Sequence, residues 1–455
     1  MFRKSEKMHF IGIGGIGMSG IAEILINLGY KVSGSDIRES DITRRLASLG
    51  AKIFIGHNLS NINDYNVVVT SSAINPANPE IIEARKRRIP IIHRSEMLAE
   101  LVRLKHSIGV AGTHGKTTTS SMLSYILYRG GINPTAIVGG KVLNFDSNAR
   151  IGEGDYIVFE ADESDGSFLR LLPTITVVTN IDADHLDHYK YFEGLKDAFL
   201  QYVNNIPFYG YSVLCIDDNI IAELIPKIER PYVTYGFSGN ADFHASDVKC
   251  LPDRTVYDCY FKNDLLGKVE IGLLGNHNVL NSLAVITVAL ELGLDFQVIK
   301  EGLKEFKGVG RRIEKIGEEK GITVFDDYGH HPTEIKATLQ AIRSMGRRII
   351  VLFQPHRYTR TQLLWEDFGT AFGNADEVIL TEIYPAGEEP IEGVSSALLK
   401  DSIEKHDGKK VNIVSRLEDI AGLVVSTAKK GDIVLTLGAG DIYKAGPMIL
   451  NTLRK

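Results

Sequence analysis

Residues 109–119 read GVAGTHGKTTT, a glycine-rich turn that ends in Lys116 and Thr117. It continues a short apolar segment that begins at Ile108 and precedes the helical pattern SSMLSYILYRGG. In such a turn, backbone N–H groups bind phosphates, the lysine reaches the outer phosphates and the threonine hydroxyl binds Mg²⁺. The strict G-x-x-x-x-G-K-[ST] spacing is not met, because Val110 stands in place of the first glycine. A tight turn explains the glycines but not the Lys-Thr-Thr-Thr run, so we predict a nucleoside triphosphate site.

A second glycine-rich loop follows the apolar segment MHFIGI near the N-terminus. It contains G-x-G-x-x-G at Gly12, Gly14 and Gly17, and Asp36 closes the next predicted strand, YKVSGSD. This pattern is typical of a dinucleotide site, with the acidic residue on a ribose hydroxyl. The glycines require only a close approach of the backbone, so a UDP-sugar satisfies the same geometry. The loop therefore predicts a diphosphate site and does not by itself indicate NAD.

Acidic residues and histidines follow two further apolar segments, as EADESD at 160–165 and TNIDADHLDHY at 179–189. Solvated acidic loops are common, but a magnesium triphosphate needs oxygen ligands across from the P-loop threonine. We predict Glu163 as a metal ligand, and a second Mg²⁺ or a group near the transferring phosphate in the second segment. Zinc is a weaker interpretation, since cysteines and a helical H-x-x-x-H are absent there. Lys196 would supplement either site or face solvent.

Three more segments carry side chains that suit recognition or proton transfer. In LGNHNVLN, His277 and Asn278 would either cap the following helix or contact a purine. DDYGHHPTE (326–334) and QPHRYTRT (354–361) each follow a predicted strand. A histidine of the first could accept a proton from an amine, and two arginines of the second could bind a carboxylate. Each segment alone could be a solvated turn, but two such segments on neighbouring strands favour a site.

Short strands and helical patterns alternate along most of the chain, which predicts α/β domains with mainly parallel sheets. The first block has strand candidates at 8–13, 30–35, 51–55, 66–70 and 89–92. The second contains YIVFEADES, TITVVTNIDADH and YSVLCIDD, antiparallel strands over 240–275 and one long helix over 278–305. After a hinge at 306–312, the strands ITVFDDY, RRIIVLFQP, EVILTEI, VNIV and DIVLTLGAGD predict another doubly wound domain. Since open α/β sheets bind ligands at the carboxyl ends of strands, the polar segments are well placed for a site.

Length and composition agree with a multidomain globular protein. At 455 residues the chain predicts about three domains, which we place at 1–103, 104–307 and 308–455. A net charge of −6 gives no basic surface for nucleic acid, and no apolar stretch is long enough for a membrane span. The N-terminus runs directly into a strand, so we expect no signal peptide. Cys215, Cys250 and Cys259 have no metal-binding spacing and are expected to be reduced thiols in a cytoplasmic protein.

Taken together, these segments resemble the bacterial Mur ligases. The resemblance covers essentially the whole chain through IGIGGIGMSGIAE, AGTHGKTTT, FEADESDGSF, TNIDADHLDHY, LGNHNVLN, GVGRRIE, DDYGHHPTE and FQPHRYTRT. It implies a Rossmann-like UDP-sugar domain, a central P-loop ATPase-type domain and a Rossmann-like amino-acid domain. It further implies an ATP- and Mg²⁺-dependent ligase that joins L-alanine to the carboxylate of UDP-N-acetylmuramic acid through an acyl phosphate, in peptidoglycan precursor synthesis. A cytoplasmic monomer or homodimer is expected.

The resemblance also implies a role for each residue that matches a family motif. The expected UDP-sugar contacts are Gly12, Gly14, Gly15, Gly17, Asp36, Ser71 and Ser72. The expected ATP contacts are Ala111, Gly112, Thr113, His114, Gly115, Lys116, Thr117, Thr118, His277, Asn278 and Arg311. Thr117, Glu163 and His185 would bind metal, and Tyr328, Arg357 and Arg360 would bind the amino acid. Lys116, His330 and His331 would be catalytic. Related ligases use a carbamylated lysine, a part not assigned to Lys196.

Three other functions are compatible with parts of the pattern. A ligase that recycles a murein tripeptide onto the same UDP-sugar differs in the third domain, where the two His- and Arg-rich segments look more like the alanine enzyme. An NAD-dependent dehydrogenase would explain the first loop but neither the P-loop nor the acidic strand ends. A nucleotide-binding regulator without ligase activity would need no amino-acid site.

Overall fold

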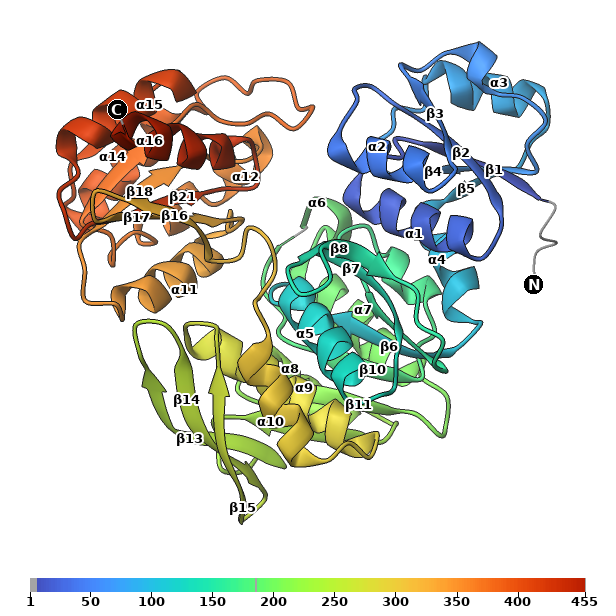
Figure 1. The fold of residues 1–455 in the computed structure, drawn as a ribbon, viewed down its shortest axis with the longest axis horizontal. Coiled ribbons are helices and arrows are strands. Elements are labelled where there is room, and N and C mark those ends of the chain that lie inside the picture. The colour runs from blue at the N-terminus through green and yellow to red at the C-terminus, as the bar shows by residue number, and fades with distance from the viewer. Residues whose placement is uncertain (1–5, 185, 455) are drawn as a thin grey trace. The chain divides into compact units, whose positions relative to one another are not determined.

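The protein's structure, a computed structural model, describes residues 6–184 and 186–454. The chain forms two compact units. The first comprises Met1–Ser246, Asp258–Val269 and Leu280–Lys307, and the second comprises Asp247–Tyr257, Glu270–Val279 and Gly308–Lys455. Figure 1 draws their helices and strands and labels them where there is room.

The N-terminal sheet is parallel and has the order β3-β2-β1-β4-β5. Its strands are β1 (Lys7–Ile11), β2 (Lys31–Asp36), β3 (Lys52–Ile55), β4 (Val67–Thr70) and β5 (Ile91–His93), which confirms the five predicted strands. Its helices are α1 (Ile16–Asn27), α2 (Asp41–Ser48), α3 (Pro79–Lys86) and α4 (Arg94–Val102). The strand order reverses between β1 and β4, and open α/β sheets bind ligands at such a point. The glycine loop after β1 and the serines after β4 share this edge.

The second sheet has ten strands in the order β15-β14-β13-β12-β11-β10-β6-β9-β7-β8. The strands are β6 (His106–Ala111), β7 (Thr135–Val142), β8 (Ser147–Arg150), β9 (Tyr156–Glu160), β10 (Ile175–Val178), β11 (Tyr211–Cys215), β12 (Tyr232–Gly236), β13 (Phe243–Cys250), β14 (Thr255–Phe261) and β15 (Asp264–Ile271). Its helices include α5 (Lys116–Arg129), α6 (Leu186–Tyr189), α7 (Phe192–Asn204) and α8 (Asn219–Leu224). Because β6 pairs in parallel with both β9 and β10, the P-loop and the two acidic segments emerge at one edge.

The single long helix predicted over 278–305 is wrong. Two helices occupy this region, α9 (Asn276–Glu291) and α10 (Phe296–Glu305). Gly293 interrupts them with a φ of 82°. Asp295 then begins α10 as its N-cap, since its carboxylate accepts a hydrogen bond of 2.8 Å from the Gln297 N–H. Apolar residues on both sides of the break concealed the turn.

Four strands were not predicted from the sequence: β7, β8, β12 and β16 (Glu314–Glu319). β7 contains two adjacent glycines, and β8 is four largely polar residues at the sheet edge. β16 has the sequence EKIGEE and is also an edge strand. Edge strands bury little apolar surface, so they lack the hydrophobic pattern that identifies a central strand.

The end of the first unit is fixed to the P-loop helix. Asn144 accepts a hydrogen bond from the Lys307 N–H at 2.8 Å and donates one to the Glu305 carbonyl at 3.2 Å. Tyr125 and Arg129 of α5 donate to the Glu305 carboxylate at 3.1 and 3.0 Å. The boundary between the two units follows directly after Lys307, inside the predicted hinge.

The second unit contains a six-stranded sheet of order β16-β17-β21-β18-β19-β20. Beside β16, its strands are β17 (Ile322–Asp327), β18 (Ile349–Phe353), β19 (Glu377–Leu380), β20 (Val411–Ile413) and β21 (Ile433–Leu437). β16 is antiparallel to β17, and the other neighbours are parallel. The helices are α11 (Pro332–Arg343), α12 (Tyr358–Leu363), α13 (Trp365–Gly369), α14 (Ser396–Asp407), α15 (Leu417–Thr427) and α16 (Ala445–Arg454).

Alternate residues of the central strand β18 enter two separate hydrophobic cores. Ile349, Val351 and Phe353 belong to one cluster, whereas Ile350 and Leu352 belong to the other. Successive side chains of a strand point to opposite faces, so helices must cover both faces of this sheet. The predicted doubly wound architecture of this region is confirmed.

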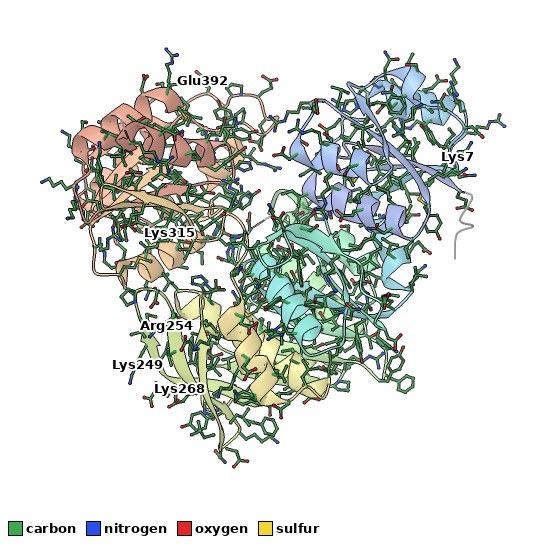
Figure 2. The ribbon with its side chains drawn as sticks, viewed as in Figure 1. Lys7, Lys249, Arg254, Lys268, Lys315 and Glu392 are labelled. Atoms are coloured by element: carbon green, nitrogen blue, oxygen red, sulfur yellow. The ribbon has the colours of Figure 1, made fainter. Side chains whose placement is uncertain are left out.

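Charged side chains lie around the periphery of both units (Figure 2). Lys7 pairs with Asp64 at 3.1 Å, and Lys315 pairs with Glu318 at 3.0 Å. Exposed pairs of this kind contribute little to stability. Among the described residues, no helix has the length and apolar character that a membrane crossing requires.

We predict that Asp295→Ala weakens the start of α10. Loss of an N-cap side chain costs about 1 kcal/mol, so hydrogen exchange at the first turn of α10 should speed up by about fivefold. Asp295→Asn keeps a capping oxygen and serves as the control, with near wild-type exchange. Equal exchange in wild type and Asp295→Ala would contradict the assignment of this cap.

Candidate active site

The P-loop lies between β6 and α5, and two of its glycines are required by their surroundings. Gly112 has a φ of 130°, and a Cβ there would lie 2.1 Å from Thr179 Oγ1. Gly115 has a φ of 83°, and its Cβ would lie 2.8 Å from Asn281 Oδ1. Gly115 is the N-cap of α5 and offers no side chain. The first N–H groups of the helix are therefore suited to an anion.

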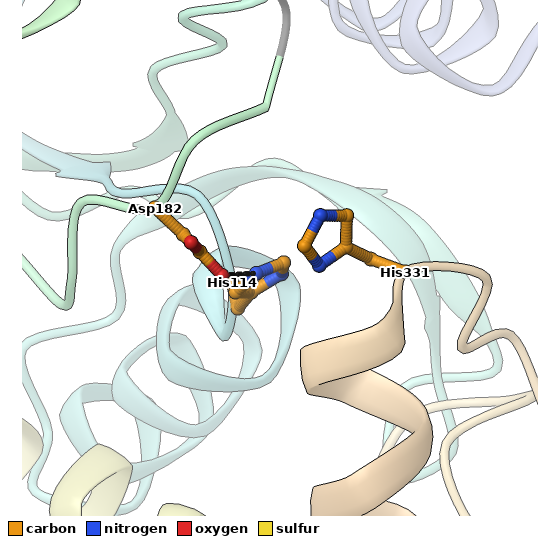
Figure 3. A group of neighbouring side chains, drawn as sticks. All are labelled: His114, Asp182 and His331. Atoms are coloured by element: carbon orange, nitrogen blue, oxygen red, sulfur yellow. Dashed lines mark hydrogen bonds and ion pairs between the residues drawn. The ribbon is translucent and has the colours of Figure 1, made fainter. Parts of the chain in front are cut away.

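The segment after β10 holds the P-loop by side-chain hydrogen bonds. The His114 N–H donates to Asn180 Oδ1 at 2.8 Å, and the His114 carbonyl accepts from Thr179 Oγ1 at 2.6 Å. His114 Nε2 lies 3.2 Å from a carboxylate oxygen of Asp182 (Figure 3). The Asp182 N–H donates to Thr113 Oγ1 at 2.8 Å. Asp182 is one of the acidic residues of the predicted segment at 179–189, whereas no role was predicted for Thr179 or Asn180, since ordinary polar residues after a strand carry no distinctive signal.

Lys116 forms a buried ion pair with Glu163. Its ammonium donates to both carboxylate oxygens at 2.9 Å, and also to the carbonyls of Gly112 at 2.5 Å and Thr113 at 3.1 Å. Glu163 is fully buried. Burial by itself lowers the pKa of Lys116, but the carboxylates of Glu163 and Asp162 raise it above its usual value. The lysine is therefore held as a cation in the turn.

The four carboxylates of EADESD do not form one cluster. Asp162 pairs with Arg94 at 2.8 Å; burial raises its pKa, but Lys116 and Arg94 outweigh this and lower it to about 2. Glu160 accepts a hydrogen bond of 2.7 Å from the Gly139 N–H. Asp165 lies 3.7 Å from His93. Glu163 is thus the member of the group that faces the P-loop lysine.

His185 and Lys196 were both considered for a site at the second acidic segment. His185, predicted as a metal ligand, lies outside the described residues. Lys196 is placed between Glu223 and Glu193, each 3.0 Å from its ammonium. Hydrogen bonds to Glu223 and Glu193 raise the pKa of Lys196. This lysine is consequently a paired cation on α7.

The end of β2 fixes the N-terminal glycine loop. The N–H groups of Gly12 and Ile13 donate to the Ser35 carbonyl at 2.8 and 3.0 Å. The Gly14 N–H donates to the Asp36 carboxylate at 2.9 Å. Asp36, predicted to contact a ribose, therefore also holds the loop. Gly15 precedes α1 as its N-cap.

Three expected contacts lie close to this loop or at the same edge. A Cβ on Gly17 would lie 3.0 Å from Arg94 Nη1, so the guanidinium that pairs with Asp162 also lies against α1. Ser71 and Ser72 directly follow β4, which pairs with β1. Arg94 was missed by the sequence analysis because a single arginine at a helix start has no motif.

In the second unit, His277 and Asn278 lie in the first turn of α9. This helix begins at Asn276, so Asn278 is inside it and is not the N-cap residue. Its Nδ2 donates to the Leu274 carbonyl at 2.8 Å and lies 3.1 Å from His277 Nε2. Burial, together with the nearby Arg312, lowers the pKa of His277 to about 4. The His277 ring is therefore neutral near pH 7.

Arg311 is built into the second unit by several contacts. Its guanidinium donates to Asp326 at 2.9 Å and to the Gly438 carbonyl at 2.7 Å. It also stacks over the rings of Tyr328 and Tyr443, at 5.0 and 4.6 Å from their centroids. These contacts fix the arginine at the entry to this unit.

A row of rings continues from Tyr328. The His330 centroid lies 5.5 Å from that of Tyr328 and 5.6 Å from that of His356. His330 also lies 3.5 Å from Glu334. His331, drawn in Figure 3, is the N-cap of α11, and its Nδ1 accepts a hydrogen bond from the Thr333 N–H. A capping role thus accounts for one nitrogen of His331.

The two predicted carboxylate-binding arginines lie at the start of α12. Arg357 is exposed, has a φ of 70° and is the N-cap of the helix. Arg360 Nη1 donates to His356 Nδ1 at 3.3 Å. Burial, together with the charges of His330 and Arg360, lowers the pKa of His356 to about 3. His356 is consequently a neutral acceptor, a role that the sequence analysis did not assign.

Three family descriptions match successive parts of the chain. They are "Mur ligase family, catalytic domain" at residues 7–106, "Mur ligase middle domain" at 110–289 and "Mur ligase, glutamate ligase domain" at 311–440. The chain belongs to the Mur ligase family. The resemblance inferred from the motifs is therefore confirmed.

Curated relatives and solved structures agree with this membership. UDP-N-acetylmuramate–L-alanine ligase of Geotalea daltonii is 54% identical over 456 residues, covering 100% of both chains. The enzyme of that name from Geobacter sulfurreducens is 53% identical, covering 100% of this Mur ligase and 99% of the relative. The crystal structure of UDP-N-acetylmuramate–alanine ligase MurC from Thermotoga maritima is 31% identical, with a TM-score of 0.85 over 98% of this chain and 99% of that one.

A murein peptide ligase from Psychrobacter arcticus shares the fold. It is 24% identical, with a TM-score of 0.73 over 99% of each chain. At this identity the likeness concerns the fold alone.

We predict that Gly112→Ala disrupts nucleotide binding. A methyl group at this position would overlap Thr179 Oγ1 and the residue would be strained at its φ, so the turn must shift. The dissociation constant for ATP, measured by calorimetry, should rise at least about tenfold. Gly239→Ala, where a Cβ meets open space, is the control. ATP binding at wild-type strength in Gly112→Ala would contradict the assignment of this turn to phosphate.

Proposed function

We propose that this Mur ligase joins L-alanine to the carboxylate of UDP-N-acetylmuramic acid with consumption of ATP. The supporting observation is full-length identity of 54% and 53% to relatives named UDP-N-acetylmuramate–L-alanine ligase. The proposal includes a cytoplasmic enzyme of peptidoglycan precursor synthesis, acting as a monomer or homodimer. It also divides the chain into a UDP-sugar domain at 1–103, an ATP domain at 104–307 and an amino-acid domain at 308–455.

The assignment of ATP to the P-loop rests on the turn before α5. Its helix N-terminus and Lys116 would bind the phosphates, with Ala111–Thr118 forming the surrounding contacts. In the second unit, His277, Asn278 and Arg311 would contact the nucleoside. Lys116 is already held as a cation inside the turn, at 2.9 Å from each oxygen of Glu163. A γ-phosphate would replace one anionic partner of this lysine by another.

The residues around Lys116 fit Mg²⁺, which prefers oxygen ligands. Thr117 offers a hydroxyl, and Glu163 offers a buried carboxylate beside the P-loop. When bound there, Mg²⁺ would supply positive charge against the phosphates of ATP. His185 is assigned to a second ion on the family resemblance alone.

The chemistry requires activation of a carboxylate, because direct attack of an amine would have to expel oxide. Transfer of the γ-phosphoryl group to the muramate carboxylate gives an acyl phosphate and ADP. The alanine amine, after loss of a proton, attacks the acyl carbon, and the tetrahedral intermediate expels phosphate. Lys116 would neutralise charge during phosphoryl transfer. His330 or His331 would accept the amine proton.

The UDP diphosphate would lie on the loop at 12–20, with Asp36 beside a ribose and Ser71 and Ser72 at the neighbouring strand end.

The alanine carboxylate would lie against Arg357 and Arg360, near Tyr328. An arginine fork matches the geometry of a carboxylate. His356 supports this use of Arg360, since it accepts a hydrogen bond from the guanidinium and carries no competing charge.

The principal rival is a ligase for a murein tripeptide. The relatives above favour L-alanine, and the murein peptide ligase contributes only a common fold at 24% identity.

Phosphate release should therefore require UDP-N-acetylmuramic acid, ATP and L-alanine together. Release with the tripeptide in place of L-alanine, and none with L-alanine, would overturn the proposed substrate.

Replacement of Lys116 tests the phosphorylating half of the reaction. Lys116→Ala should lower kcat by about 10²–10³-fold, because charge stabilisation in the transition state is lost. Lys227→Ala, an exposed lysine of the same unit, is the control and should retain wild-type kcat. Turnover of Lys116→Ala at the wild-type rate would exclude this lysine from catalysis.

Replacement of Arg357 tests recognition of the amino acid. Arg357→Ala should raise the KM for alanine by about tenfold or more, since a charged hydrogen bond to its carboxylate is lost. The KM values for ATP and UDP-N-acetylmuramic acid should not change. The control is Arg416→Ala, whose side chain is 74% exposed in the same unit. An unaltered KM for alanine would show that Arg357 does not bind the carboxylate.

A further inference from the structure

A buried carboxylate lies behind the glycine loop of the N-terminal sheet. Glu80, in the first turn of α3, has no exposed surface. It accepts hydrogen bonds from Ser35 Oγ at 2.5 Å and Asn61 Nδ2 at 2.6 Å. His57 Nδ1 lies 3.1 Å and His9 Nε2 lies 3.8 Å from its oxygens. Nothing in the proposed reaction uses these four partners.

A single residue, Ser35, connects the Glu80 carboxylate to the glycine loop. Ser35 is the penultimate residue of β2, and its carbonyl accepts the N–H groups of Gly12 and Ile13. The Ser35 side chain is bonded to Glu80 while its backbone holds the loop. A displacement of the Ser35 side chain would therefore alter the support of the expected diphosphate site.

A second series of hydrogen bonds connects Glu80 to the glycine loop through the end of β3. Asn61 donates from the same Nδ2 to the Gly56 carbonyl at 3.0 Å, and the Gly56 N–H donates to the Asp36 carbonyl at 2.7 Å. The Asp36 carboxylate in turn accepts from the Gly14 N–H. Glu80 thus supports both ends of the hydrogen-bonded frame that holds residues 12–14.

His57 completes the arrangement at the same edge. It follows β3, the strand that pairs with β2 as far as Asp36. Its Nδ1 is within 3.1 Å of Glu80 and 3.0 Å of Ser35 Oγ, so the ring is fixed from one side. Its side chain is 16% exposed, whereas that of Glu80 is fully buried. The nucleoside part of a ligand at Asp36 would lie at these strand ends.

The charge of Glu80 requires this set of partners. Burial raises the pKa of Glu80, but the neighbouring His9 and the hydrogen bonds from Ser35 and Asn61 outweigh it and lower the pKa to about 2. A buried anion is costly unless it is paired and hydrogen-bonded. His9 is itself buried, accepts or donates a hydrogen bond at Ser33 Oγ and stacks on Tyr65.

We propose that Glu80 is a positioning residue for the UDP-sugar. Through Ser35 and Asn61 it sets the place of the glycine loop, and through His57 it orients an imidazole beside the expected nucleoside. This inference rests on the proposed function, because the ligand is the UDP-sugar of that reaction. Glu80 contacts no substrate and acts only through these three side chains.

The variant Glu80→Gln keeps the size of the side chain and removes its charge. Calorimetry without ATP should give a dissociation constant for UDP-N-acetylmuramic acid about tenfold higher than for the wild type. In steady-state assays, the KM for this substrate should rise by the same factor, while kcat and the KM values for ATP and alanine stay within about twofold. Glu83→Gln, on the same helix and paired with Arg87 at 2.6 Å, is the matched control with wild-type values.

A solely structural role would give a different result. It would lower kcat through loss of folded enzyme and leave every KM unchanged, which would overturn the proposal. If Glu80→Gln does not fold, Ser35→Ala decides, since it removes the contact through Ser35 while Asn61 and His57 stay beside the Glu80 carboxylate. Ser35→Ala should raise the dissociation constant for the UDP-sugar, and wild-type binding would contradict the inference. Binding by the wild type without turnover would instead refute the proposed ligase activity and leave this test standing.

Discussion

The P-loop of the first unit depends on the ion pair between Lys116 and Glu163. Two opposite charges are removed from water, and each would be costly to bury alone. Together with the carbonyls of Gly112 and Thr113, they satisfy each other and shape the turn around the lysine. Groups of the protein alone therefore hold the turn. In the proposed reaction, a triphosphate would replace Glu163 as the anionic partner of Lys116, which would release the carboxylate for Mg²⁺.

The ion pair depends on the order of the strands. β6 lies between β9 and β10, so Lys116 after β6 pairs with Glu163 after β9. Thr113 of the same turn accepts a hydrogen bond from the Asp182 N–H after β10. The N-terminal sheet uses the same rule, since the end of β2 holds the loop after β1. In both sheets, polar side chains beyond one strand fix a glycine turn beyond its neighbour. Parallel pairing thus brings each glycine turn next to the polar residues that hold it.

The motifs and the strand alternation predicted the parallel strands of the first and third sheets, the strands around the P-loop and its position, but not the parallel strands β7 and β12. These features have strong local signals: apolar strands, glycines at tight turns and charged residues at strand ends. The break between α9 and α10 was missed because Leu292 and Leu294 continue the apolar pattern across Gly293. β16 was missed because its charged side chains resemble a loop.

The residues that pair with the acidic side chains also could not be predicted from the sequence. EADESD places four carboxylates directly after one strand, yet Asp162 pairs with Arg94 and Glu160 accepts a hydrogen bond from the Gly139 N–H. Arg94 lies 68 residues from Asp162 along the chain, so only the folded arrangement reveals the pair. Glu80 is a similar case, because its three hydrogen-bonding partners come from distant segments.

The anchoring of Glu305 has a mechanical consequence for the linker. The side chains that hold its carboxylate, Tyr125 and Arg129, belong to the helix whose first turn forms the P-loop. A helix transmits axial and rotational displacements along its length with little loss. If nucleotide binding at the proposed phosphate site tilted α5, Tyr125 and Arg129 would therefore carry that displacement to Glu305 and to the start of the linker.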